Sequence, residues 1–253
     1  PESVADLRLK TAWARLDSGW AAATAGRQIL NYGRGALWSP VDIFSSLEAD
    51  LLSSARRGID SLRLAAPLGS TGLLDLVAAP KARPEEGSYA LRLSGLLVPG
   101  LDSGALAAHE DGAWLAGADF KLDWELSLYG EGLYSLPESG GEGFFRAAAG
   151  ADWSVGDLVL AAEYYYNGDR PAAEDPYQAG AHNLYAALSW GASDLASLRA
   201  YGIWDICDET GSAVLALYLS AAQNADLGLY LSGASAGDSG YSAKAGVDIT
   251  VKF

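Results

Sequence analysis

Charged residues recur in the middle of segments whose other residues are mostly apolar and alternate along the chain. In AWLAGADFKLDW (residues 113–124), Asp119 and Lys121 occupy alternate positions, and Arg199 has the same setting in LASLRAYGIWD. Charges at such positions would be very costly if they faced lipid. We therefore expect them to line a water-filled space, where they could select solutes by charge.

Catalysis or metal binding would need groups that the sequence does not bring together. A nucleophile requires a base and an orienting group, but the two histidines, His109 and His182, lie in no triad motif, and Cys207 has no second cysteine to pair with. The segment NGDRPAAED (167–175) has carboxylates that could hold calcium, although no loop has the EF-hand spacing. We expect no enzyme activity, no catalytic residue, no cofactor and no metal site.

The elements that carry these charges are predicted to be β-strands, because alternation with a period of two runs through most of the chain. In residues 113–124, Trp114, Phe120 and Trp124 share one face, and Asp119 and Lys121 share the other. At about 3.3 Å per residue in a tilted strand, the spacing of the two tryptophans matches the height of a bilayer-facing band. A soluble β-sandwich also alternates, but aromatic residues at the ends of the apolar faces favour a membrane barrel. The predicted membrane girdle is Trp13, Trp20, Trp114, Trp124, Trp153, Trp190 and Trp204.

We predict an all-β fold, a single transmembrane antiparallel up-and-down β-barrel over residues 1–253. Strands are expected near 4–16, 20–32, 59–66, 72–79, 88–98, 102–109, 113–123, 125–135, 144–154, 157–167, 183–191, 195–207, 212–221, 226–234 and 241–253. Single-chain bacterial barrels have an even number of strands. We therefore expect about 16 strands, with the first one before Pro1, or fourteen if 102–109 is not a strand.

Composition narrows the possible partners. The formal net charge is −15, which argues against nucleic acid, because phosphate binding needs a basic face. The sequence contains no run of 18 apolar residues, which a transmembrane helix would need. The expected partners are the lipid bilayer and small solutes.

The chain ends on ITVKF, an alternating strand whose last residue is Phe253. Bilayer hydrocarbon tolerates no open sheet edge, so the last strand of a barrel must be paired along its length. The terminal Phe253 resembles the C-terminal assembly signal of outer-membrane proteins. The resemblance implies recognition by the barrel-assembly machinery and an integral location in the bacterial outer membrane.

One stretch resembles a known group of proteins. AGRQILNYGRGALWSPVDIFSS (25–46) is similar to the GRQ…WG…SP-D-F stretch near the start of alginate-export-like and uncharacterised outer-membrane porins. RRGIDSLRL and AEYYYNGD also resemble segments of such proteins. The resemblance implies a porin-like channel and names no solute.

The segment after this stretch is predicted to form a short helix from about 46 to 56. Ser45 stands three residues before Glu48, which is the spacing of a capping box, and Gly58 follows as a stop. The helix could lie on the outer rim, or the loop 33–58 could fold into the lumen as a constriction. The loop carboxylates that could then take part are Asp42, Glu48 and Asp50.

Charges assigned to the inner face define the expected pore lining. They are Arg8, Lys10, Arg27, Arg63, Arg92, Asp119, Glu131, Arg146, Asp152, Glu163, Arg199 and Asp205. We expect Arg27, Arg63 and Arg92 to form one basic wall, with counter-charge supplied by the loop 33–58. The pattern predicts a channel for passive passage of small hydrophilic or charged solutes. The alternative is a filled barrel that serves as a scaffold or assembly partner, with a protein bound at an open N-terminal seam.

Overall fold

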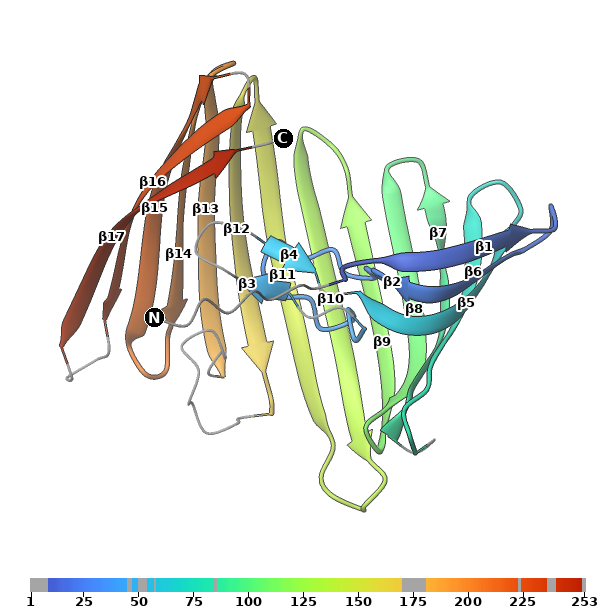
Figure 1. Ribbon diagram of the computed structural model, residues 1–253. Helices are drawn as coiled ribbons and strands as arrows, with labels where there is room; N and C mark the ends of the chain where they lie inside the picture. The colour runs from blue at the N-terminus through green and yellow to red at the C-terminus, as the bar shows by residue number, and fades with distance from the viewer. Residues whose placement is uncertain are drawn as a thin grey trace. The chain divides into compact units, whose positions relative to one another are not determined.

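The strands of the protein begin and end close to where the alternation of the sequence does. The computed structural model describes residues 9–44, 47–49, 54–56, 58–83, 86–169, 181–222, 224–235 and 240–251. Within these residues, fifteen strands form one antiparallel sheet in which neighbours in the chain are neighbours in the sheet (Figure 1). The strands are β1 (Ala12–Asp17), β2 (Ala22–Gln28), β5 (Ile59–Leu68), β6 (Gly72–Ala79), β7 (Ser88–Val98), β8 (Leu101–Glu110), β9 (Ala113–Leu122), β10 (Leu126–Pro137), β11 (Phe144–Val155), β12 (Leu158–Asn167), β13 (His182–Ser193), β14 (Ala196–Asp205), β15 (Thr210–Ala222), β16 (Ala225–Ser235) and β17 (Tyr241–Val251).

The predicted all-β, up-and-down architecture is confirmed, and each expected strand position holds a strand of the large sheet. The segment at 102–109 is β8, so the alternative total of fourteen strands is not needed. Residues 9–11, which were expected in the first strand, precede β1, since that strand begins at Ala12. Among the residues that the structure describes, no helix is long and apolar enough to cross a membrane.

The helix expected at 46–56 is wrong. Its described residues form an antiparallel pair of strands, β3 (Leu47–Ala49) and β4 (Ser54–Arg56), with Leu47 opposite Arg56 and Ala49 opposite Ser54. A capping box contributes only about 1 kcal/mol and is a local signal. Here Arg56 also forms an ion pair with Asp42, a tertiary contact that a local signal does not include.

The chain divides into two compact units. Unit 1 comprises Pro1–Gly33, Val41–Ala118 and Tyr134–Gly143, and unit 2 comprises Arg34–Pro40, Asp119–Leu133 and Phe144–Phe253. In unit 1, Asp75, Val77, Ala90 and Arg92 are buried on one face of β6 and β7, whereas Leu76 and Leu91 on the other face are 41% and 45% exposed. We call the face with the buried polar residues the inner face and the other the outer face.

Unit 2 has the same two-faced organisation. On β12, Glu163 and Tyr165 are buried and Tyr164 between them is exposed, and on β15 Val214 is buried while Leu215 is exposed. Large apolar side chains therefore occupy the exposed face and charged side chains the covered one. This arrangement is the reverse of a soluble sheet and is typical of a sheet whose outer face meets lipid.

Candidate functional site

Residues 34–40 of the long loop lie on the inner face of unit 2, where two glutamates bind their backbone. Glu131 on β10 accepts hydrogen bonds at Oε1 from the backbone N–H groups of Arg34 and Gly35, the latter at 2.7 Å. Its Oε2 accepts a bond of 2.7 Å from the Ser39 hydroxyl. Both carboxylate oxygens of this buried side chain therefore bind one loop segment.

Glu163 on β12 binds the next three residues in the same way. Ala36 N donates to Oε2 at 2.6 Å, while Leu37 N and Trp38 N donate to Oε1 at 3.3 and 2.7 Å. The Tyr129 hydroxyl adds a bond of 2.8 Å to Oε2. Five consecutive backbone amides thus point at two carboxylates, an arrangement of successive N–H groups that favours anions. Charge-assisted bonds of this kind offset the cost of burying a carboxylate.

Two further contacts and one steric constraint fix the segment on unit 2. The Arg34 Nε donates to Asp119 Oδ1 at 3.0 Å. The Trp38 ring stacks on Tyr165 with ring centroids 5.3 Å apart. Gly35 has no space for a side chain, because a Cβ there would overlap the Trp38 carbonyl oxygen and lie 3.0 Å from Glu163 Oε2. We call residues 34–40 the seated segment.

Unit 1 has its own polar cluster on the inner face. Arg63 on β5 donates to both oxygens of Asp75 on β6, at 2.8 and 2.6 Å. Arg92 on β7 lies opposite Asp75 in the register and under the Tyr32 ring, with its guanidinium carbon 5.0 Å from the ring centroid. Asp42 accepts from Tyr32 N at 3.3 Å and pairs with Arg56. The cluster joins two arginines to one strand carboxylate and one aromatic ring.

The expected basic wall differs from the one observed in two ways. Arg27 pairs with Asp60 at 3.0 and 2.5 Å on the outer face, where Leu62 is also exposed, so it is not on the inner face with Arg63. The counter-charge for Arg63 comes from Asp75, not from the loop. The first error arises because β2 is AATAGRQ, whose small residues give the two faces no apolar contrast.

Among the loop carboxylates proposed for a constriction, Asp42 binds Arg56 within unit 1. Glu48 lies in β3 opposite Ala55. Asp50 lies outside the described residues, as do Arg8 and Phe253, and Lys10 lies before β1 begins. The part of the loop that does meet inner-face carboxylates is the seated segment, which supplies amides instead of acids.

The other predicted lining residues occupy separate places on unit 2. Arg146 lies over the Phe144 ring at 5.5 Å, and Arg199 lies over Tyr218 at 5.2 Å. Asp152 is 3.8 Å from Lys121. Asp205 accepts bonds of 2.9 and 3.2 Å from the backbone N–H groups of Cys207 and Asp208, so it orders the following turn.

The seven tryptophans expected in the girdle are all exposed, from 41% for Trp153 to 74% for Trp124. Trp114, Trp153, Trp190 and Trp204 lie on outer faces of the sheet, and Trp20 and Trp124 lie in turns. Trp13 is misassigned, because the register places it opposite Gly26 and in line with the buried Ser61 on the inner face. The role of these residues at the bilayer interface stays a prediction.

Several residues of the site were not identified from the sequence. They are Tyr32, Gly35, Trp38, Asp75 and Tyr129. Asp75 could have been found, because it lies at an inner-face position of LLDLVAA beside Arg63 and Arg92. The amides of the seated segment carry no sequence signal, because any residue type supplies an N–H group.

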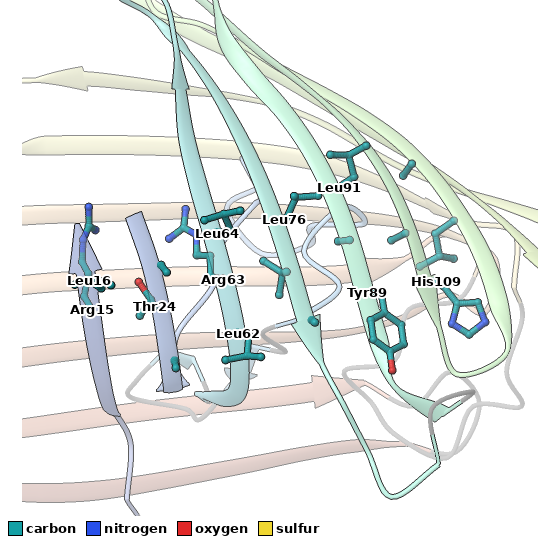
Figure 2. Close-up of a pocket in the computed structure, with 18 of the residues that line it drawn as sticks. Arg15, Leu16, Thr24, Leu62, Arg63, Leu64, Leu76, Tyr89, Leu91 and His109 are labelled. Carbon is teal, nitrogen blue, oxygen red and sulfur yellow. The ribbon is translucent and has the colours of Figure 1, made fainter. Parts of the chain in front are cut away.

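A groove of about 1390 Å³ lies on the outer face of unit 1. Figure 2 shows Leu62, Leu64, Leu76 and Leu91 among the residues that line it, together with His109. His109 Nε2 is 3.3 Å from Glu138 Oε1. These leucines alternate with inner-face residues, so the groove is part of the apolar exterior. Among the described residues, no group of three His, Cys, Asp or Glu side chains could hold a metal ion.

No family model matches the chain, and no curated protein matches it. Solved structures do match. OccAB4 of Acinetobacter baumannii has a TM-score of 0.68 at 8% identity, over 96% of this chain and 74% of that one. OccK5 (OpdH) of Pseudomonas aeruginosa has a TM-score of 0.65 at 8% identity, over 96% and 81%. OccK10 (OpdN) of the same organism has a TM-score of 0.61 at 10% identity, over 94% and 82%.

These proteins are outer-membrane porins of the Occ/OprD family, which are channels and not enzymes. The chain therefore has the fold of an outer-membrane porin barrel.

Proposed function

We propose that the protein is an integral outer-membrane channel for passive passage of small hydrophilic or charged solutes, and that the seated segment forms its constriction. The observation that carries this proposal is the set of hydrogen bonds that residues 34–39 donate to the carboxylates of Glu131 and Glu163. These bonds hold a loop on the inner face of strands whose fold is that of porins. A loop fixed inside a barrel narrows the path that solutes take.

The charges of the inner face support a passage that selects solutes over a barrel whose interior is filled by paired side chains. The Arg63 side chain is 30% exposed although it pairs with Asp75, and Asp152 and Lys121 are each 31% exposed and 3.8 Å apart. Charges that only filled a closed interior would be fully covered. Partly hydrated charges of both signs suit a water-filled passage.

Planar-bilayer recording tests the proposal. The purified, folded protein is expected to give step-like ion currents, whereas the same protein unfolded by heat gives none. Folding is checked independently by the altered electrophoretic mobility of the unheated barrel. A folded protein that inserts into the bilayer and gives no current steps would rule out the channel.

Two finer assignments belong to this proposal. Assembly by the barrel-assembly machinery rests on Phe253 and on the alternation of β17 before it. The alginate-export-like character rests on residues 25–46, where Gly35 and Trp38 hold the seated segment in place. Removing Phe253 is expected to lower the amount of folded protein in the outer membrane without changing refolding in detergent.

A further inference from the structure

Aromatic rings follow one another across the inner face of unit 2. Successive strands β12 to β16 each contribute one tyrosine to this face. We name these rings, together with Trp38 of the seated segment, the aromatic path: Trp38, Tyr165, Tyr185, Tyr201, Tyr218 and Tyr230. Leu184, Trp204, Leu215 and Leu229 stand one or three positions from these tyrosines and are exposed on the outer face, which places the tyrosines on the inner one.

The register makes the rings step along the strands as well as across them. Tyr165 lies opposite Asn183, two residues before Tyr185, and Tyr185 lies opposite Ile203, two residues after Tyr201. The rings are close enough to form a continuous surface at the start of the path. Trp38 and Tyr185 have centroids 6.3 Å apart, and Tyr185 and Tyr201 have centroids 6.4 Å apart.

The direction continues on β15, whereas Tyr230 on β16 lies two residues back, opposite Ala216. Tyr201 lies opposite Val214, four residues before Tyr218, and Tyr218 lies opposite Gly228, two residues before Tyr230. From Tyr165 to Tyr218, the rings therefore advance from the end of β12 next to its long connection toward the short β15–β16 turn. A solute that moved along this face would meet one ring after another.

A glycine lets one of the rings lie against the wall, and a second ring faces a glycine across the sheet. Tyr230 is opposite Gly246 on β17, where a Cβ would overlap the ring. Tyr218 is opposite Gly228 on β16, where a Cβ would be 3.6 Å from the ring. A ring that covers the backbone of the neighbouring strand turns its other face away from the wall. At Tyr230 such a face can meet a flat solute, whereas the Tyr218 ring has the Arg199 guanidinium over it.

The groups beside the path do not favour one sign of charge. Arg199 lies over Tyr218 at 5.2 Å, while Asp205 and Asp248 supply carboxylates and Lys244 another cation on the same inner face. Flat aromatic surfaces bordered by hydrogen-bonding groups of mixed charge suit a neutral ligand with an apolar face and polar edges. Pyranose sugars have this character, because their ring C–H groups form the face and their hydroxyls form the edges.

The repeat of the path points to a ligand that also repeats. Neighbouring strands are about 4.8 Å apart, so a chain of flat units can meet several rings at once, whereas a single aromatic solute would use only one or two. We propose that the aromatic path is a binding track for neutral oligosaccharides, an assignment that rests on the channel function proposed above.

The test is single-channel recording with maltohexaose and cellohexaose as probes. Each sugar is expected to interrupt the ion current, with a frequency that rises with its concentration, whereas poly(ethylene glycol) of similar length causes no discrete interruptions. Replacing Tyr201 or Tyr218 by Leu keeps an apolar side chain but removes the flat ring. Each replacement should weaken sugar binding about threefold to tenfold, and Phe at the same positions should restore most of it.

Tyr164→Leu is the matched control, because this tyrosine lies on the outer face of the same strand as Tyr165. It should leave the interruptions at the wild-type level. Ion currents that no sugar interrupts would overturn the track and leave the channel standing. Leu variants that bind sugar as wild type does, or interruptions by nicotinamide but not by sugars, would overturn the sugar assignment.

Absence of any ion current would refute the channel instead. Saturation-transfer NMR of the detergent-solubilised protein with maltohexaose then decides separately whether the rings bind sugar. A signal that the Tyr201→Leu variant lacks would support the track, and no signal from the wild-type protein would overturn it.

Discussion

At the scale of single residues, the central feature is the use of carboxylates as ligands for backbone amides. Glu163 is only 3% exposed, and it accepts bonds from three consecutive amides and one phenol. A hydrogen bond to a charged group contributes about 1.5–3 kcal/mol. Without the carboxylate, the same amides would be left without acceptors on a covered face. The Glu163 carboxylate therefore holds the seated segment in place through its backbone amides.

Glu163→Gln should release this segment without unfolding the sheet. Glutamine replaces one acceptor oxygen by an NH₂ group, which would face the amides of Ala36 or of Leu37 and Trp38. A spin label on Ala36→Cys, in a Cys207→Ser background, should become more mobile, because Ala36 has an exposed side chain and its amide loses an acceptor. Electron paramagnetic resonance line shapes measure this mobility in the reconstituted protein.

Asp152→Asn is the control for that experiment. It removes one negative charge from the same inner face, but Asp152 is near Lys121 and not the seated segment. The label should remain as immobile as in the parent protein. Equal mobility in the Glu163→Gln and parent proteins would show that the carboxylate does not hold the segment.

At the scale of elements, the strands were predictable and their faces only partly so. Segments such as FFRAAAGADW and LVLAAEYYY mark their own faces, because large side chains alternate with charges. β2 lacks this contrast, and a shift of one residue moves every side chain to the other face. For this reason Arg27 was assigned to the inner face, while the structure places it with Asp60 on the outer one.

The seated segment could not be predicted for a different reason. Its contact between Ala36 and Glu163 joins residues 127 positions apart, and one partner is a backbone amide. The failed helix at 46–56 shows the opposite problem, since the capping-box spacing was visible but the tertiary contact of Arg56 with Asp42 was not. A sixteenth strand before β1 stays a prediction.

Arg63 and Arg27 provide a direct test of the two faces of the sheet. Each pairs with one aspartate on a neighbouring strand, Asp75 for Arg63 and Asp60 for Arg27. Arg63→Ser should uncover Asp75 on the inner face and shift the reversal potential in a salt gradient toward cation preference. Arg27→Ser should leave it unchanged, because the Asp60 it uncovers is on the outer face. Equal shifts in the two variants would mean that both arginines line the passage.

At the scale of the whole molecule, the two units share one rule. Exposed positions of the outer face mostly carry large apolar side chains, with the Arg27–Asp60 pair as an exception, and covered positions carry buried charges such as Asp75, Asp119 and Glu131. In water this distribution would be unfavourable on both faces, because apolar area stays exposed and charge is desolvated. In a bilayer the outer face is satisfied by lipid, and the inner charges are satisfied by one another, by the seated segment and by water.

A lysine on the outer face should therefore be far more costly than its exposure suggests. Leu215 lies near the middle of β15 and is 46% exposed. In a soluble sheet, replacing such a residue by Lys would change the free energy of unfolding by about 0.5 kcal/mol or less. In a bilayer, Leu215→Lys should lower it by about 2–4 kcal/mol near the midplane. Urea unfolding in lipid vesicles measures this difference.

Ser212→Lys is the control, because Ser212 lies on the inner face of the same strand, opposite Ile203 and Ala234, where the introduced lysine can reach water. A small loss for Leu215→Lys, equal to that of Ser212→Lys, would place the leucine face in water and contradict the membrane-spanning orientation of the sheet.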